Sequence, residues 1–219
     1  MKHQISFLVV EDHPIYRQGI VELIKSDSRY LVSAEAGSFD EAVSAVSRAT
    51  PDIALVDISL YDKDGLDFVC ILHAQSPKVP ILVISMHEEK VYASRALAAG
   101  ARGYVMKYET AAVIRQAVAT VLAGHVFVSE SLRYRYVDSM FGKAEETISA
   151  LPNGLSGRGL QIFELIALGY GPKEISDVLN LSVKTVDAYR DRLKQKLGMR
   201  TASELRKFAA AWRRNADKW

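Results

Sequence analysis

Short apolar runs alternate with segments of helical periodicity through the first 128 residues. Five runs of four to six residues predict strands, at residues 5–10, 30–34, 53–57, 79–84 and 103–106. The run at 53–57 is typical of a strand buried on both faces, as in a parallel sheet. The segments between and after the five runs predict five helices, at 14–24, 39–49, 66–75, 88–99 and from Thr110 to Gly124. This alternation is typical of an α/β fold, a doubly wound five-stranded parallel sheet.

Capping residues support several of these helix boundaries. Pro14 suits the first position of a helix, and Ser38 and Thr110 are good N-cap residues. Gly100 can terminate the fourth helix. In the first helix, the apolar face is expected to consist of Ile15, Ile20, Leu23 and Ile24.

Chemically active side chains follow four of the five predicted strands. Glu11 and Asp12 follow the first strand, Asp57 ends the third, Ser85 ends the fourth and Lys107 follows the fifth. Each has a simple structural explanation by itself: a helix cap, a turn, a strand-end hydroxyl or a surface charge. In a parallel sheet, however, all five lie at the carboxyl edge, where ligands bind in open α/β folds.

These residue types together indicate phosphoryl chemistry. Three neighbouring carboxylates repel one another unless a cation lies among them, and oxygen ligands suit Mg²⁺. A lysine and a hydroxyl beside that cation can hold a phosphoryl group, while a carboxylate can accept it covalently. We therefore interpret Asp57 as a nucleophile that forms an aspartyl phosphate.

Beyond residue 128 the pattern becomes helical. A linker helix is predicted over 129–141 and a flexible tether over most of 142–154. Four helices follow, at 156–168, 172–179, 183–197 and 201–212. The second and third are joined by Asn180-Leu181-Ser182, a short connection typical of a helix-turn-helix. The predicted domains are residues 1–127, a linker over 128–150, and a small all-α domain over 151–219.

The third of these helices has two different faces. One is expected to be core and consists of Val186, Tyr189, Leu193 and Leu197. The other carries Lys184, Asp187, Ala188, Asp191, Arg192 and Gln195. In a helix-turn-helix such a face enters the major groove of DNA, although it could also be the solvated face of a small helical bundle. The predicted DNA contacts, within 172–191 and just beyond, are Lys184, Thr185, Asp187, Ala188, Asp191 and Arg192.

Composition narrows the choice of function. Residues 1–128 carry 12 basic and 15 acidic side chains, net −3, whereas the remainder carries 16 and 11, net +5. A basic second half favours a polyanionic partner, although a solvated surface would also explain it. No apolar run is long enough to span a membrane, and no signal peptide precedes the first strand. Cys70 is the only cysteine, which fits a cytoplasmic protein.

The set Glu11-Asp12, Asp57, Ser85 and Lys107 resembles the receiver domain of bacterial two-component response regulators, over about residues 4–124. The resemblance implies a sensor histidine kinase as phosphoryl donor. It also implies Mg²⁺ held by Asp12, Asp57 and the backbone carbonyl of Ser59, with Glu11 acting mainly through water. Ser85 and Lys107 would bind the phosphoryl oxygens, and Tyr104 would turn inward when they do. Tyr61 departs from the proline usual in the loop after the acceptor.

The second half resembles the four-helix DNA-binding domain named after LuxR and shared with NarL and FixJ, over about 151–214. The motifs are Leu155-Ser156-Gly157-Arg158, Lys173-Glu174-Ile175, Ser182-Val183-Lys184-Thr185-Val186 and Lys196-Leu197-Gly198. At positions 159 and 161 the family usually has glutamates, where this chain has Gly159 and Gln161. Tyr189 replaces the family's common histidine, and Asp187 replaces a common lysine. Because two acids lie on the groove-facing surface, we hypothesise that Asp187 or Asp191 accepts a hydrogen bond from cytosine N4.

Three classes of function compete. The leading one is a transcription factor switched by phosphorylation, which would favour a homodimer on double-stranded DNA. The second is a signalling adaptor that acts by protein contacts and has a degenerate DNA-binding domain. The third, a hydrolytic enzyme using an aspartyl phosphate, is disfavoured because Ser59, not a carboxylate, lies two residues after Asp57. The five histidines show no metal-ligand spacing, so a zinc enzyme is not supported.

Overall fold

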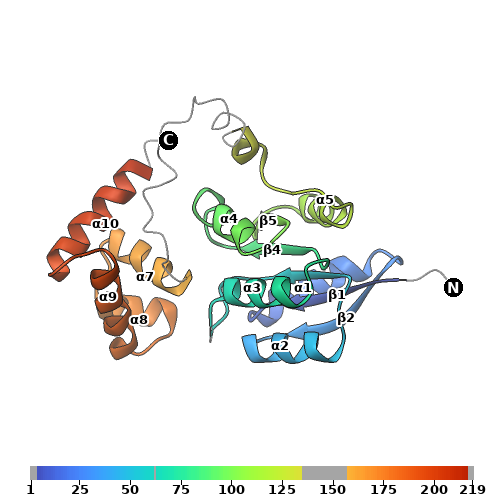
Figure 1. Ribbon diagram of the computed structural model, residues 1–219, viewed down its shortest axis with the longest axis horizontal. Coiled ribbons are helices and arrows are strands. Elements are labelled where there is room, and N and C mark those ends of the chain that lie inside the picture. The colour runs from blue at the N-terminus through green and yellow to red at the C-terminus, as the bar shows by residue number, and fades with distance from the viewer. Residues whose placement is uncertain (1–3, 62, 135–156, 217–219) are drawn as a thin grey trace. The chain divides into compact units, whose positions relative to one another are not determined.

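The computed structural model describes residues 4–61, 63–134 and 157–216. The chain forms two compact units, residues 1–144 and 145–219, which are described separately below (Figure 1). None of the helices among the described residues is long and apolar enough to cross a membrane.

The first unit is built on a five-stranded parallel sheet. Its strands are β1 (Ile5–Val10), β2 (Tyr30–Ala36), β3 (Ile53–Val56), β4 (Ile81–Ser85) and β5 (Gly103–Met106). They lie in the order β2-β1-β3-β4-β5, and every neighbouring pair is parallel. The direction of winding therefore reverses between β1 and β3, which is the switch point where such sheets bind ligands. The predicted fold class is confirmed.

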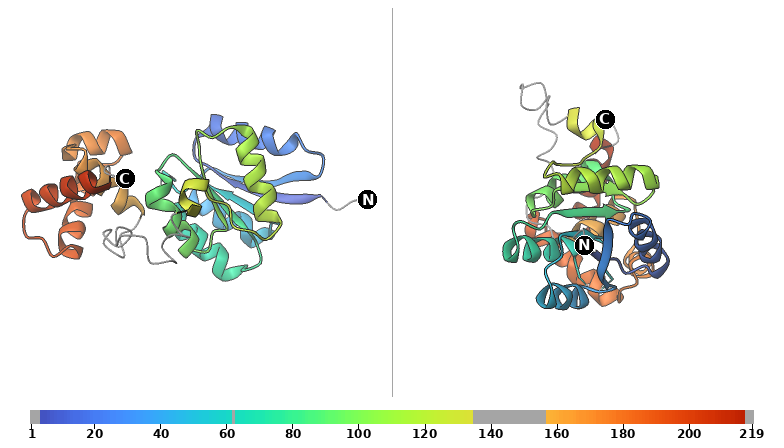
Figure 2. Two further views of the ribbon diagram at one scale, coloured as in Figure 1. Left: turned by 90° about the horizontal axis from the view of Figure 1, so that it is seen from above. Right: turned by 90° about the vertical axis from the view of Figure 1, so that its right-hand side faces the viewer.

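Helices cover both faces of the sheet (Figures 1 and 2). They are α1 (Pro14–Lys25), α2 (Phe39–Arg48), α3 (Gly65–Gln75), α4 (Glu89–Ala98) and α5 (Ala111–Leu122). One core layer joins α1 and α5 to alternate residues of β1 such as Phe7 and Val9. The N-caps behave as predicted, because the Ser38 and Thr110 side chains each accept a hydrogen bond from a backbone N–H three residues later.

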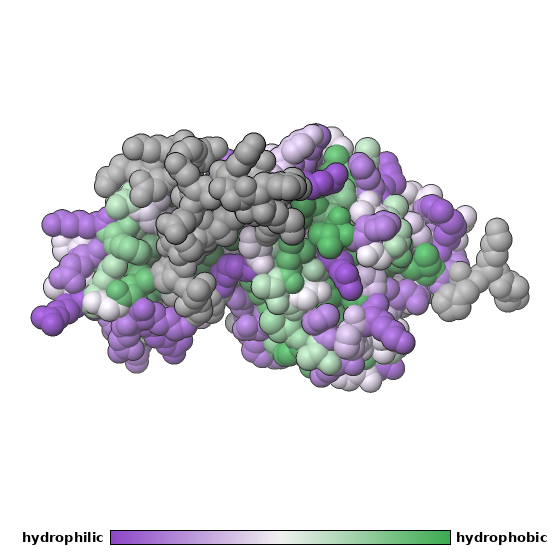
Figure 3. All heavy atoms as spheres, turned by 45° about the horizontal axis from the view of Figure 1, so that its top comes forward, coloured by the Kyte–Doolittle hydropathy of each residue, from purple (hydrophilic) through white to green (hydrophobic). Residues whose placement is uncertain are grey.

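The predicted apolar face of α1 is wrong at Ile15, which is 89% exposed. The buried residues of this helix are Ile20, Val21 and Ile24. At 3.6 residues per turn, Ile15 lies about 180° around the helix from Ile24, so both cannot face the sheet. Figure 3 shows hydrophobic residues, in green, between hydrophilic ones on the surface that it displays.

The segment after α5 returns to the sheet beside β5. The N–H of Phe127 donates to Arg102 O at 3.0 Å, and the N–H of Tyr104 donates to Phe127 O at 2.9 Å. Val128 and Leu132 are buried in the same unit, and residues 130–134 are helical. The rest of the predicted linker helix, residues 135–141, and the predicted tether lie outside the described residues, so the proposed domain boundaries stay predictions.

The second unit consists of α7 (Gly157–Ala167), α8 (Pro172–Leu179), α9 (Val183–Lys196) and α10 (Ala202–Ala216). The last helix is therefore longer than the predicted 201–212. The buried apolar residues are Leu160, Ile162, Phe163, Ile166, Ile175, Val186, Leu193, Leu205 and Ala209. The predicted cap Ser156 lies outside the described residues.

Two of the four predicted core residues of α9 are only partly buried. Val186 and Leu193 are buried, whereas Tyr189 and Leu197 are intermediate. Tyr189 lies about 60° around the helix from Val186, at the margin of the buried face. The Arg192 guanidinium lies over the Tyr189 ring, 5.5 Å from its centroid. Leu197 is only partly buried because it lies just beyond the last turn of α9.

Candidate functional site

The sheet brings the predicted site residues together at its carboxyl edge. Glu11 follows β1, Asp57 follows β3, Ser85 ends β4 and Lys107 follows β5. All four are buried. Lys107 Nζ lies 2.6 Å from Glu11 Oε2 and 2.7 Å from Asp57 Oδ2, so one ammonium bridges two carboxylates that are 46 residues apart in sequence.

Backbone contacts hold the acceptor candidate, Asp57, in place. Its N–H donates to Val10 O at 2.8 Å, and its Oδ1 accepts from the Ser59 N–H at 2.9 Å. The start of α3 approaches the same loop closely at Gly65. A Cβ on Gly65 would lie 2.2 Å from Asp57 O and 2.5 Å from Ile58 Cα, so this position has no room for a side chain.

The charges at this edge do not balance. Glu11, Asp12 and Asp57 carry three formal negative charges and Lys107 one positive charge, which leaves the charge that one divalent cation would neutralise. Burial, followed by repulsion from Asp57, raises the pKa of Glu11. Burial alone would lower the pKa of Lys107, but Asp57 and Glu11 outweigh it and raise that pKa.

Tyr16 of α1 forms one wall of the site. Its hydroxyl donates to Lys107 O at 3.2 Å, and its ring centroid lies 4.8 Å from Lys107 Nζ. Burial, with the nearby negative charges of Glu11 and Asp57, raises the pKa of Tyr16 to about 12. The phenol therefore stays neutral throughout the physiological range.

The residues at this edge fit a divalent cation. One ligand atom from each of Glu11, Asp12, His13 and Asp57 lies within 4.8 Å of all the others. Both Glu11 oxygens are already engaged, one by Lys107 and the other by the His13 N–H. In contrast, Asp12 Oδ1 is buried and, among the described residues, has an ion pair with His13 Nδ1 at 2.8 Å but no hydrogen bond. The direct metal contact predicted for Asp12 and the water-mediated contact predicted for Glu11 stay predictions.

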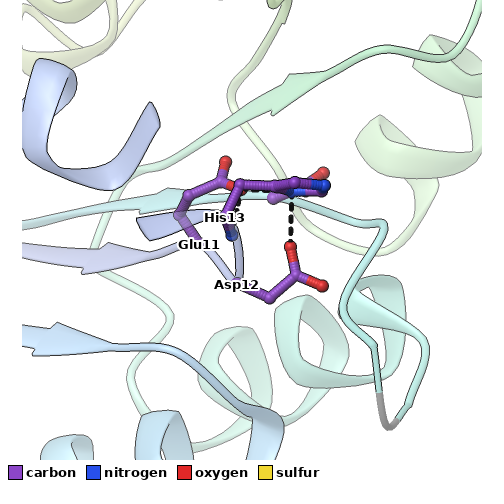
Figure 4. Close-up of side chains that lie close together, drawn as sticks. Glu11, Asp12 and His13 are labelled. Carbon is purple, nitrogen blue, oxygen red and sulfur yellow. Dashed lines mark hydrogen bonds and ion pairs between the residues drawn. The ribbon is translucent and has the colours of Figure 1, made fainter. Parts of the chain in front are cut away.

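His13 is the member of this cluster that the sequence analysis missed. Figure 4 shows its ring beside the carboxylates of Glu11 and Asp12. The five histidines together lack metal-ligand spacing. The signal for His13 was instead a single imidazole next to two acids in sequence.

The predicted switch residues contact one another through the loop after β4. Tyr104 is fully buried, and its hydroxyl donates to His87 O at 2.8 Å. The His87 N–H donates to Ser85 Oγ at 3.1 Å. The backbone of His87 therefore connects the hydroxyl at the edge of the sheet to the inward-facing aromatic ring. The same loop packs against α4, where the His87 ring stacks on Tyr92 with centroids 4.4 Å apart.

The second unit contains the predicted helix-turn-helix, formed by α8, a short turn and α9. Asn180 adopts the left-handed conformation at φ 50°, which asparagine tolerates better than most residues. Ser182 then caps α9 by accepting a hydrogen bond from the Thr185 N–H at 3.0 Å. Arg158 of α7 donates to Leu179 O at the end of α8, and also to Gln161. Gln161 thus orients the arginine that joins α7 to this motif.

The predicted DNA-contacting residues lie along the outer side of α9. Lys184, Asp187, Ala188, Asp191 and Arg192 are exposed, and Thr185 is partly exposed. Both acids form ion pairs within the helix. Asp187 Oδ1 lies 2.9 Å from Arg190, and Asp191 Oδ1 lies 2.8 Å from Lys194 Nζ. The hydrogen bond from Lys194 lowers the pKa of Asp191.

Two family models match this chain. Residues 7–119 match the response regulator receiver domain, and residues 153–209 match the bacterial regulatory proteins of the luxR family. The chain belongs to the LuxR-type response regulators. The family is one of signalling proteins rather than of enzymes, and its receiver domain implies a histidine kinase as partner.

Similar proteins cover most of the chain. The oxygen regulatory protein NreC of Staphylococcus aureus is 30% identical over 209 residues, which is 94% of this chain and 96% of that protein. A LuxR-family two-component response regulator from Aurantimonas has 31% identity and a TM-score of 0.58, covering 63% of this chain and 99% of its own. RcsB from Salmonella enterica serovar Typhimurium, solved bound to promoter rprA with phosphomimetic BeF₃⁻, has the same fold at 21% identity. Its TM-score is 0.59, with 95% and 99% coverage.

Proposed function

We propose that this response regulator accepts a phosphoryl group on Asp57 from a sensor histidine kinase and thereby changes how its C-terminal domain binds DNA. The observation that carries the proposal is the buried Asp57 carboxylate paired with Lys107 at 2.7 Å, at the switch point of the sheet. A buried, lysine-paired carboxylate at such an edge has the surroundings of a functional group rather than of a solvated turn residue.

The transfer is a substitution at phosphorus. A carboxylate oxygen of Asp57 attacks the phosphorus of a phosphohistidine, and the new O–P bond forms as the P–N bond breaks. The electron pair of the broken bond leaves with the imidazole nitrogen of the kinase. The same site would take a phosphoryl group from a small donor and lose it slowly to water, which is the only catalysis that we propose for this chain.

Mg²⁺ is the cation that we propose for this site. Asp12, Asp57 and the Ser59 carbonyl would hold it directly, with Glu11 contributing through water. The oxygen donors and the residual double negative charge support this assignment. When bound, the ion neutralises charge on the transferring phosphoryl group. Lys107 supplies a second positive charge from the protein itself, already oriented by Glu11 and Asp57.

We infer that Ser85 and Tyr104 couple the phosphoryl group to the surface of the domain. A phosphoryl group adds about −1.5 to −2 charge and three acceptor oxygens. If the Ser85 hydroxyl turns toward it, the His87 N–H loses its acceptor at 3.1 Å and the loop must adjust. The Tyr104–His87 hydrogen bond then favours one of the two positions of the loop after β4. A contact that differs between two states in this way is what a two-state switch requires.

The outer side of α9 is proposed to enter the major groove, with Lys184, Thr185 and Arg192 available for phosphates or base edges. Asp187 and Asp191 are proposed to accept from cytosine N4. Their ion pairs with Arg190 and Lys194 do not prevent this, because ion pairs between solvent-exposed side chains are weak. Phosphorylation is expected to favour a homodimer, whose two recognition helices would reach half-sites about 34 Å apart.

The first experiment tests the acceptor. The full chain is incubated with acetyl phosphate and Mg²⁺, and phosphate incorporation is measured by intact-protein mass. Asp57→Asn should abolish the added phosphoryl group, whereas the matched control Asp67→Asn, an exposed acid in the first turn of α3, should retain it. Undiminished loading of Asp57→Asn would disprove the assignment.

The second experiment tests the output. Genomic fragments are selected with the full chain, with and without acetyl phosphate, and binding is repeated over a range of salt concentrations. A steep salt dependence with a defined sequence preference supports transcriptional regulation. Binding without either property would instead favour the adaptor. Asp187→Ala and Asp191→Ala should relax the base preference, and an unchanged selected sequence in both would refute their proposed contacts.

A further inference from the structure

The His13 ring occupies an unusual position for the residue that precedes a helix. His13 is the N-cap of α1, yet its side chain makes no capping hydrogen bond. Instead, Nδ1 lies 3.0 Å from Glu11 Oε1 and 2.8 Å from Asp12 Oδ1 (Figure 4). A ring nitrogen carries at most one proton, which the two carboxylates would have to share in a weaker three-centre hydrogen bond. A cation among the three groups is the other physical reason for their convergence.

The separations match those of ligands around one metal ion. Two ligand atoms at right angles, each about 2.1 Å from an octahedral ion, lie about 3 Å apart. The distance from His13 Nδ1 to Asp12 Oδ1, the neighbouring proposed direct ligand, is 2.8 Å. Asp57 also contributes a ligand atom within the same 4.8 Å cluster.

Asp12 supplies an independent observation. Its Oδ1 is buried and forms an ion pair with His13 Nδ1 at 2.8 Å, but no contact of hydrogen-bond geometry is found for it among the described residues. A buried carboxylate oxygen without a well-aligned donor is costly, and a cation is a partner that would satisfy it. The neighbouring Glu11 does not have this deficit, because Lys107 and the His13 N–H occupy its oxygens.

We propose that His13 Nδ1 is a direct ligand of the divalent cation at this edge and shifts its selectivity from Mg²⁺ toward ions that accept nitrogen. The inference rests on the proposed function only in placing a cation there. Mg²⁺ favours oxygen ligands, whereas imidazole suits the later divalent transition metals, whose affinity for such sites rises from Mn²⁺ to Co²⁺ and beyond. The chain would thus hold its cation with two carboxylates, one carbonyl and one imidazole.

The test measures metal binding to the full chain without a phosphodonor. Mn²⁺-loaded protein is studied by pulsed electron paramagnetic resonance, which detects the nuclear spin of a coordinated nitrogen. Wild type should show this nitrogen coupling, and His13→Ala should lose it. The matched control is His125→Ala, because His125 is also an exposed histidine of the first unit but lies outside the cluster.

A second measurement separates ligation from structural support. In competition titrations, His13→Ala should lower the Co²⁺ affinity by roughly tenfold or more while the Mg²⁺ affinity changes much less. His13→Asn, which keeps a polar group but removes the imidazole, should behave in the same way. Both variants should fold, because the His13 side chain is 67% exposed and caps nothing.

Either of two results would overturn the proposal. One is a nitrogen coupling that is absent from wild type or that survives in His13→Ala. The other is an equal loss of Co²⁺ and Mg²⁺ affinity, which would mean that His13 only positions the carboxylates. Failure of the proposed function would be visible elsewhere, as undiminished phosphate loading of Asp57→Asn.

Discussion

Replacement of Gly65 by alanine tests how the structure shapes the acceptor loop. The new Cβ would lie 2.2 Å from Asp57 O, 2.5 Å from Ile58 Cα and 3.1 Å from Asp57 C. All three are backbone atoms, so no side chain can rotate away to make room. Restoring ordinary contact requires the start of α3 and the loop after β3 to separate by about 1 Å. Overpacking of this kind typically costs about 1–3 kcal/mol, and the rigid surroundings favour the upper end.

Gly19→Ala is the matched control, because it is the same chemical change with the opposite expected sign. Gly19 lies in the middle of α1, and nothing is within 4 Å of its added Cβ. Alanine should stabilise this helix by about 0.8 kcal/mol relative to glycine. The first unit of Gly65→Ala should therefore melt roughly 10 °C lower than wild type, whereas Gly19→Ala should melt a few degrees higher.

Two spectroscopic signals locate the effect within the chain. Both tryptophans, Trp212 and Trp219, belong to the second unit, so tryptophan fluorescence follows that unit, while far-ultraviolet circular dichroism follows both. Gly65→Ala should shift the circular dichroism transition and leave the fluorescence transition in place. It should also slow phosphate loading, because Asp57 O must move. Equal melting temperatures for Gly65→Ala and Gly19→Ala would refute the steric argument.

Three further predictions follow from the site and the helix-turn-helix. In an alkaline absorbance titration, Tyr16→Phe should remove a phenol that ionises near pH 12. Because folding raises the pKa of Tyr16 above its ordinary value of 10, the contribution of this phenol to stability is present below pH 10 and is lost as the pH rises through 12. Without a divalent cation, Asp12→Asn should raise the unfolding free energy measured by calorimetry by about 1 kcal/mol, because it relieves like-charge repulsion. Millimolar Mg²⁺ should remove this difference between the variant and wild type. Arg158→Ala should lower the unfolding free energy of the second unit, followed by fluorescence, by about 1–3 kcal/mol, because Leu179 O and the buried Gln161 lose a donor. Arg158→Lys controls for the charge, and an unchanged transition in Arg158→Ala would show that this link is dispensable.

Much of the architecture follows from local sequence pattern. Five apolar runs define five strands, and capping residues such as Ser38 and Thr110 mark helix starts to within a residue. Because parallel strands end at a common edge, the pattern also predicts that Glu11, Asp57 and Lys107 meet, although they are far apart in the chain. These features depend on the period of apolar residues, which a single sequence displays directly, and on the right-handed connection of parallel strands, which is general to such folds.

The tertiary structure decided how these side chains are shared. Sequence reasoning gave Lys107 a role toward the phosphoryl group only and gave His13 none. In the structure, Lys107 Nζ bridges Glu11 and Asp57, and the His13 ring turns back between two carboxylates. Side-chain direction depends on neighbours contributed by other strands, so it has no periodic signature. The same reason explains Ile15, which is apolar and helical yet 89% exposed. Hydrophobicity predicts that a helix is amphipathic, but only packing selects which residues the sheet covers.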